Sequence, residues 1–258
     1  MKIIILNSGS NGNAVYVESS ESGAGILLDC GISRKQIESK LKIHGRFLES
    51  IDAIFITHEH QDHVRGLYVL SKSHHMPVYG STQTMHSMWK HDSIKTMKLI
   101  HNMESVQVAD ITVQAFPKNH DAADPVFFVV TIAKKKFLYA TDLGTHNEEL
   151  IQLLPEVDAL MLESNYDFDM LMNGIYPPDI KERIHSDHGH LSNVQCMELI
   201  ERHCHAHLKV LIFGHISENN NTPQIVEREY HSMMERKKNF TPRMHIASRY
   251  DVSEIIEV

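Results

Sequence analysis

The chain has 258 residues, of which 42% are hydrophobic and 22% are charged, the composition of an ordinary globular protein with room for a large buried core. Its formal net charge of −8 at pH 7 gives no overall basic field, although a local basic patch could still bind nucleic acid. No stretch approaches the roughly 18 apolar residues of a membrane span, and the N-terminus lacks the apolar region of a signal peptide. We therefore expect a cytoplasmic protein without membrane contact.

The sequence contains no repeat, low-complexity segment or linker, so we expect a single domain over residues 1–258. Its three cysteines, Cys30, Cys196 and Cys204, form no C-x-x-C motif, which predicts reduced and mostly buried thiols. Histidine is the unusual residue type, because the chain has 20, more than one site could use.

Short apolar runs alternate with helical patterns along the chain. The expected strands, in chain order, are residues 2–6, 15–17, 26–28, 51–56, 111–116, 126–133, 137–140, 160–162 and 210–213. The small-residue segment SGSNGNA at 8–14 predicts a loop, and the lysines at 134–136 predict a hairpin turn. A helix is expected over residues 64–74, ended by Pro77, and a second one begins near residue 193. Ser192 is its expected N-cap, with Gln195 completing a capping box.

Several of these strands lead into a polar residue that can bind or support a metal. In chain order these residues are Asp29, His58, His120, Asp142 and His215. Sites in α/β proteins form beyond the carboxyl ends of strands, where loops converge on a rigid scaffold. The pattern therefore predicts one site at the strand ends.

The densest cluster is THEHQDH at 57–63, an H-x-H-x-D-H motif directly after an apolar strand. In a turn at this point, His58 and His60 can face one metal, while Asp62 and His63 turn toward a second. Imidazole and carboxylate ligands suit zinc, iron or manganese, and the lack of a thiolate ligand argues against a structural zinc site. The alternative is a solvated loop that happens to be rich in histidine.

This motif resembles the signature of the metallo-β-lactamase superfamily. The likeness extends to the family's supporting Asp at Asp29 in LLDCG, its third metal-binding His at His120, its bridging carboxylate at Asp142 in YATD and its last His at His215 in FGHIS. The segments SGSNGN, LESNYD, GHLSN and HISENNNTP further resemble the YycJ-like branch, which is related to RNase Z-type phosphodiesterases and whose members are nucleic-acid exonucleases. Tyr166 stands where a His is expected in that branch.

The resemblance implies an α/β fold, a four-layer αββα sandwich of metallo-β-lactamase type with the site at one edge. It implies two divalent metal ions, Zn or Mn with Fe as an alternative. One metal would be held by His58, His60, His120 and Asp142, and the other by Asp62, His63, Asp142 and His215. In two-metal chemistry a bridging hydroxide attacks phosphorus, and Asp62 can orient this nucleophile or accept its proton.

Further residues are expected to contact the substrate or to support the ligands. His190 is the candidate for protonating the leaving group; the alternative is a loop histidine that binds a backbone carbonyl. Ser10, Asn13 and Ser192 are expected to bind phosphate, since small-residue loops and helix N-termini can do so. Glu163 could fix a ligand histidine or form a salt bridge at the sheet end.

Other histidines are weaker candidates. His203 and His207, four residues apart, fit a solvated helix end better than a metal site, whereas His185 or His188 could touch the substrate.

The function expected from these features is a metal-dependent phosphodiesterase that acts as an exonuclease on nucleic acid, DNA more than RNA. Local basic clusters such as Lys181–Arg183 favour it, and the net charge of −8 does not. The alternatives are an RNA-processing nuclease or a hydrolase of small thioesters, lactones or cyclic phosphodiesters. A non-enzymatic metal or redox protein ranks last, because every expected ligand is present. Homodimerisation is a further expectation.

Overall fold

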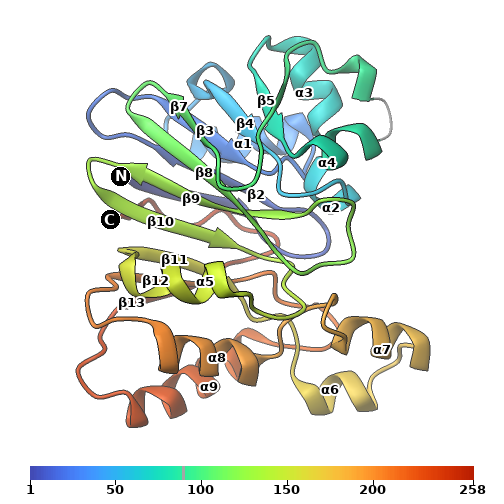
Figure 1. Ribbon diagram of the computed structural model, residues 1–258, viewed down its shortest axis with the longest axis vertical. Coiled ribbons are helices and arrows are strands. Elements are labelled where there is room, and N and C mark those ends of the chain that lie inside the picture. Colours follow the sequence, from blue (N-terminus) through green and yellow to red (C-terminus); the bar gives the residue numbers. More distant parts are fainter. Residues whose placement is uncertain (89–90) are drawn as a thin grey trace. The chain divides into compact units, whose positions relative to one another are not determined.

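A computed structural model describes residues 1–88 and 91–258 and divides the chain into two compact units. Unit 1 comprises Met1–Pro117, Ala122–Lys135 and Ser248–Val258, and unit 2 comprises Lys118–Asp121 and Lys136–Ala247. Each unit has its own strands and helices (Figure 1). The expectation of one domain over residues 1–258 stays a prediction.

The larger sheet of unit 1 has the strand order β14-β1-β2-β3-β4-β5-β6. Pairing is antiparallel from β14 to β3 and parallel from β3 to β6. The strands are β1 (Lys2–Asn7), β2 (Ala14–Glu18), β3 (Gly25–Leu28), β4 (Ala53–Phe55), β5 (Val78–Gly80), β6 (Met97–Leu99) and β14 (Ile256–Glu257). The central strands β2 to β4 are buried along their whole length, which explains their continuous apolar sequence.

A second group of strands in unit 1 is an antiparallel meander of β7 (Ser105–Val108), β8 (Ile111–Pro117) and β9 (Val126–Ile132). The ring of Phe128 on β9 meets that of Phe55 on β4 edge to face, with 5.8 Å between the ring centroids. The two groups of strands therefore share an apolar core. The helices of this unit are α1 (Arg34–Ile43), α2 (Gln61–Val64), α3 (Leu67–Ser73) and α4 (Thr82–Ser87), with 3-10 turns at Leu48–Ser50 and His91–Ser93.

Unit 2 is built on parallel strands β10 (Lys135–Ala140), β11 (Ala159–Glu163), β12 (Val210–Gly214) and β13 (Arg243–Ile246). Its helices are α5 (Glu148–Leu153), α6 (Phe168–Asn173), α7 (Pro178–His185), α8 (Asn193–His203) and α9 (Pro223–Arg236), with a 3-10 turn at Leu154–Glu156. Helices α8 and α9 pack against each other on one side of the sheet, and α6 and α7 lie together at one end of the unit (Figure 1). Because the strands are parallel, their carboxyl ends meet at one edge.

The structure confirms the expected strands with small shifts at their ends, except that the run at 51–56 yields only the short strand β4. The turn between β9 and β10 is present, with positive φ at Ala133 and Lys134. Ser192 and Gln195 form the expected capping box at the start of α8. No helix in the described part of the chain combines the length and apolar character that a membrane crossing requires.

The helix expected over residues 64–74 is wrong as a single element. It begins earlier, as α2, and is interrupted before α3. The cause is Gly66, which lies so close to the preceding loop that a Cβ there would be 1.9 Å from the carbonyl oxygen of Ile32. Gly66 also donates its backbone N–H to the carbonyl of Cys30, so tertiary contact overrides the helical pattern.

Candidate metal centre

The H-x-H-x-D-H residues of unit 1 are His58 and His60, in the turn after β4, and Asp62 and His63, in α2; together they form the unit 1 cluster. The rings of His58 and His63 are buried, with 4.0 Å between their centroids, and His58 Nε2 lies 3.1 Å from His60 Nδ1. His60 is the N-cap of α2, so the helix turns Asp62 and His63 away from the preceding strand. The local sequence therefore gathers three imidazoles and one carboxylate.

Asp29 fixes the orientation of the central histidine of this cluster. Its Oδ2 accepts a hydrogen bond from His63 Nδ1 at 2.8 Å, and its Oδ1 accepts one from the Thr57 backbone N–H at 2.9 Å. Both Asp29 and His63 are fully buried. A carboxylate bound to Nδ1 makes Nε2 the ring nitrogen with a lone pair to offer, which is the usual support of a metal-binding histidine.

The loop after β1 packs directly against the unit 1 cluster. Asn13 is buried, its backbone N–H donates to the Asp62 carbonyl at 2.7 Å, and its Nδ2 lies 3.1 Å from His63 Nε2. The close approach requires Gly31, where a Cβ would lie 1.6 Å from the Asp62 carbonyl oxygen. Ser10, in contrast, is exposed. A phosphate-binding role for Ser10 and Asn13 stays a prediction.

In unit 2, side chains from three loops and from the end of β11 surround Asp142 and form the unit 2 cluster, which consists of His120, Asp142, Glu163, His190 and His215. Three of its imidazoles approach Asp142 Oδ1: His215 Nε2 lies 3.4 Å away, and His120 Nε2 and His190 Nδ1 each lie 3.9 Å away. One donor atom from each of Asp142, Glu163, His190 and His215 lies within 4.8 Å of the others, close enough to hold a metal ion.

Glu163, at the end of β11, ties two of these histidines together. Its Oε1 accepts from His190 Nδ1 at 2.7 Å and from His215 Nδ1 at 2.8 Å. Its Oε2 accepts from the backbone N–H groups of Leu143 and Leu191 at 2.8 and 3.2 Å. The buried carboxylate thus connects the strand-end loops of the unit, and its contacts with the two histidines are ion pairs when the rings are protonated.

Burial and charge shift the titration of this cluster. Burial alone would raise the pKa of Glu163, but the rings of His190 and His215 lower that pKa overall, so the carboxylate is ionised. Burial lowers the pKa of His120, which keeps its ring in the neutral form that binds metal. His120 Nδ1 also lies 3.1 Å from the carbonyl oxygen of Gly189, which leaves Nε2 directed toward Asp142.

Three candidate residues that follow strands have a left-handed backbone, with φ of 58° at Asp29, 57° at Asp142 and 52° at His215. This conformation is uncommon for residues other than glycine, although Asp and His adopt it more readily than most. Such strain persists only where the surroundings enforce it, and it concentrates at functional sites. It changes the direction of the chain within two residues of the last pairing residue of each strand.

An asparagine network joins three loop segments of unit 2 and was not expected from the sequence. Asn165 donates to the carbonyl of His215 at 2.8 Å, and Asn221 donates to the carbonyl of Ser164 at 2.9 Å and to Asn193 Oδ1 at 2.8 Å. These side chains lie in ESNYD, GHLSN and SENNN, so the abundance of asparagine in the three segments was the available signal. The network fixes the loop that carries His215.

Tyr166 and Ser192 have local partners. Tyr166 is fully buried and its hydroxyl donates to His185 Nδ1 at 2.7 Å, and burial raises the pKa of this phenol to about 12. Ser192 accepts from the Gln195 backbone N–H at 3.2 Å and donates to Gln195 Oε1 at 2.8 Å. The hydroxyl of Ser192 therefore caps α8, and its expected contact with phosphate stays a prediction.

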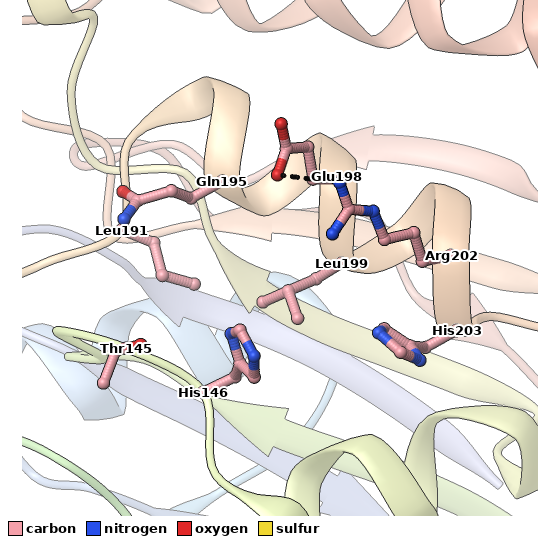
Figure 2. A pocket seen from close by; sticks show the side chains of 8 residues that line it. All are labelled: Thr145, His146, Leu191, Gln195, Glu198, Leu199, Arg202 and His203. Atoms are coloured by element: carbon pink, nitrogen blue, oxygen red, sulfur yellow. Dashed lines mark ion pairs between the residues drawn. The ribbon is translucent and has the colours of Figure 1, made fainter.

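A pocket of about 240 Å³ in unit 2 lies between the loop after β10 and helix α8 (Figure 2). His146 and His203 both line it, and Glu198 and Arg202 pair beside it at 3.7 Å, one turn apart on α8. His203 is part of none of the metal-suited donor groups formed by the described residues. This pocket is therefore not the candidate metal centre.

Comparisons with known proteins show the superfamily of the chain. A sequence profile of the beta-lactamase superfamily domain matches residues 25–216. The exodeoxyribonuclease WalJ of Streptococcus pneumoniae serotype 2 (strain D39 / NCTC 7466) is 36% identical over 231 residues, which are 87% of this chain and 84% of the relative. The exodeoxyribonuclease YycJ of Bacillus anthracis is 33% identical over 237 residues, 90% of this chain and 89% of the relative. The chain therefore belongs to the beta-lactamase superfamily, in the branch that contains these two relatives.

The fold is also shared with a solved structure. The metallo-beta-lactamase fold protein YhfI from Bacillus subtilis matches 98% of this chain and 99% of its own, with a TM-score of 0.70 at 16% identity. This likeness confirms the predicted metallo-β-lactamase fold, in which mixed sheets are flanked by helices. Membership of the superfamily likewise supports the prediction of a metal-dependent hydrolase.

Proposed function

We propose that the protein is a metal-dependent exonuclease that hydrolyses phosphodiester bonds in DNA in preference to RNA. The observation that carries the proposal is the unit 2 cluster, in which three imidazoles converge on one Asp142 oxygen. The WalJ and YycJ relatives, which are named exodeoxyribonucleases, support the reaction and the substrate.

The donor set fits divalent metal ions. His63, His120 and His215 each have Nδ1 bound to a carboxylate or carbonyl oxygen, the arrangement that presents Nε2 to a metal. We propose, from membership of the superfamily, that the ligands expected from the sequence bind two divalent ions. One ion would be bound by His58, His60, His120 and Asp142, and the other by Asp62, His63, Asp142 and His215. Nitrogen and oxygen ligands of this kind suit Zn or Mn, with Fe as a third candidate.

When bound, two such ions would lower the pKa of water toward neutrality and stabilise the charge that develops at phosphorus. The protein's own residues then handle protons and orientation. Asp62, at the start of α2, orients the attacking water or accepts its proton. His190 binds Glu163 through Nδ1, so its Nε2 is the nitrogen that can give a proton to the leaving oxygen. The His190 side chain is 20% exposed, so substrate can reach it.

The test is a comparison of nucleic acids with restored metals. Metal-stripped protein is supplied with Mn²⁺, Zn²⁺ or Fe²⁺ and incubated with DNA and RNA labelled at either end, both single- and double-stranded. Stepwise shortening that requires metal supports an exonuclease, and the first end to be lost gives its polarity. The double variant Asp62→Ala, His63→Ala should abolish the shortening, whereas His207→Ala, which removes an exposed histidine, should not.

A protein that binds metal but cuts no nucleic acid would contradict the proposal and favour a small thioester, lactone or cyclic phosphodiester as substrate. Faster shortening of RNA than of DNA would contradict the preference for DNA. Cytoplasmic location and homodimerisation stay predictions, and light scattering on the purified protein tests the second.

A further inference from the structure

Next to His190, unit 2 contains a second pocket, of about 380 Å³, which is within the range of about 300–1,000 Å³ typical of small-molecule sites. We call it the α7 pocket. The residues that line it are Asp121, Tyr176, Ile180, Arg183, Ile184, Gly189 and His190. One side is apolar and aromatic, and the other carries charged and titratable groups, so the pocket suits a ligand with a flat ring and an anionic group.

The apolar side is made by Tyr176 and by helix α7. Ile180 and Ile184 are four residues apart and therefore lie on one face of the helix. The hydroxyl of Tyr176 accepts a hydrogen bond from Asn219 Nδ2 at 2.8 Å, and this asparagine lies in the loop that follows His215. The ring of Tyr176 is half-buried, and its hydroxyl is bound by the loop that carries the candidate metal ligand His215.

The polar side is made by Arg183, Asp121 and His190. Arg183 Nε donates to Asp121 Oδ2, and the Arg183 side chain remains 60% exposed, so the planar guanidinium can also donate to a phosphate. Its partner, Asp121, directly follows the candidate ligand His120. The ion pair thus connects Arg183 to the loop that carries the candidate metal ligand His120.

The pocket is joined rigidly to His190. The His190 backbone N–H donates to the Ile184 carbonyl at 2.9 Å. Gly189 packs so tightly against the end of α7 that a Cβ would lie 2.2 Å from the carbonyl oxygens of Arg183 and Ile184. The distance from the pocket walls to the His190 ring is therefore fixed by the backbone.

We propose that the α7 pocket receives the terminal nucleotide of the substrate strand. The base lies against Tyr176, Ile180 and Ile184, and the phosphate points toward Arg183 and His190. Stacking on an aromatic ring accepts any base, as a nuclease without sequence preference requires. A pocket that holds the terminal nucleotide is consistent with exonuclease action. The inference rests on the proposed function and specifies its substrate contact.

The test measures binding rather than cleavage, by calorimetric titration of the full-length protein with Mn²⁺ present. The probes are deoxyadenosine 5′-monophosphate and 2-deoxyribose 5-phosphate, which differ only in the base. Wild-type protein should bind the nucleotide about tenfold more tightly, a factor at the lower end of the range for base–aromatic stacking. Tyr176→Ala should bring this ratio close to one, whereas Tyr176→Phe keeps the ring and should keep the ratio.

Ile175→Ala is the matched control, because Ile175 precedes Tyr176, is 86% exposed and does not line the pocket. It should leave the ratio unchanged, and melting curves establish that each variant is folded. Equal binding of both probes by wild type, or an unchanged ratio in folded Tyr176→Ala, would overturn the inference. Wild type that shows the ratio but cuts no nucleic acid would support the pocket and refute the nuclease. Wild-type protein that shortens DNA but binds both probes equally would support the nuclease and refute the pocket.

Discussion

Replacing Glu163 by Gln should weaken metal binding by unit 2 and change its free energy of unfolding only slightly. The Gln oxygen can replace Glu163 Oε2 as the acceptor for the backbone N–H groups of Leu143 and Leu191. Its NH₂ group then faces His190 Nδ1 and His215 Nδ1, to which the carboxylate now binds at 2.7 and 2.8 Å. Both rings must carry their proton on Nε2 instead, the nitrogen that His215 would offer to a metal.

The magnitude follows from these contacts. Replacing two hydrogen bonds to a charged group, at about 1.5–3 kcal/mol each, by two neutral ones, at about 0.5–1.5 kcal/mol each, costs about 2–3 kcal/mol in total. Removing a fully buried charge relieves a desolvation penalty of several kcal/mol, so the two effects largely cancel in the free energy of unfolding. We expect a change of about 2 kcal/mol or less in urea unfolding. Metal affinity has no such compensation and should fall by about 10- to 100-fold.

The assay is a competition titration of Mn²⁺ or Zn²⁺ against a chelating dye, with urea unfolding of the metal-free protein alongside. Glu201→Gln is the matched control, because it removes a surface carboxylate that pairs with Arg236 at 2.8 Å. It should cost less than about 1 kcal/mol and leave metal affinity unchanged. Wild-type metal affinity in Glu163→Gln would refute the argument that Glu163 sets the protonation of the two histidines.

Three further predictions concern packing and burial. Gly189→Ala should lower the free energy of unfolding by about 1–3 kcal/mol in urea titrations, because its Cβ would overlap two carbonyl oxygens of α7; unchanged stability would contradict this close approach. Asn221→Ala should lower the melting temperature and weaken metal binding, since it removes the donor that ties the His215 loop to the buried Ser164 carbonyl and Asn193 Oδ1. Burial raises the pKa of all three cysteine thiols above the ordinary value, so native protein should react slowly with Ellman's reagent at pH 8. All three thiols should react once the protein is unfolded, and fast reaction of the native protein would show an exposed thiol.

Those parts of the site that depend on short-range sequence could be predicted. The H-x-H-x-D-H motif compresses four candidate ligands into six residues, so any turn after the strand gathers them. The buried strands were also recognisable, because parallel strands covered on both faces are continuously apolar. Their ends consequently located Asp142 and His215 at the edge of one sheet.

Contacts between distant residues could not be predicted. Glu163 binds His190 and His215, which are 27 and 52 residues away, and no local pattern encodes such pairs. The break at Gly66 depends on a loop more than 30 residues earlier in the chain. The left-handed backbone at Asp142 and His215 is uncommon even for Asp and His, and no local sequence pattern indicated it.

The central claim is that Asp142 binds the divalent metal on which the proposed cleavage of DNA depends, and Asp142→Asn tests it most directly. Asparagine tolerates the left-handed backbone at φ 57° and preserves the shape of the side chain, so the fold should survive. Bound Mn²⁺ per chain is measured by mass spectrometry after equilibrium dialysis, together with shortening of end-labelled DNA. The account predicts two ions and shortening for wild type, with both reduced in the variant. Two ions bound with wild-type affinity and unchanged shortening in Asp142→Asn would contradict it.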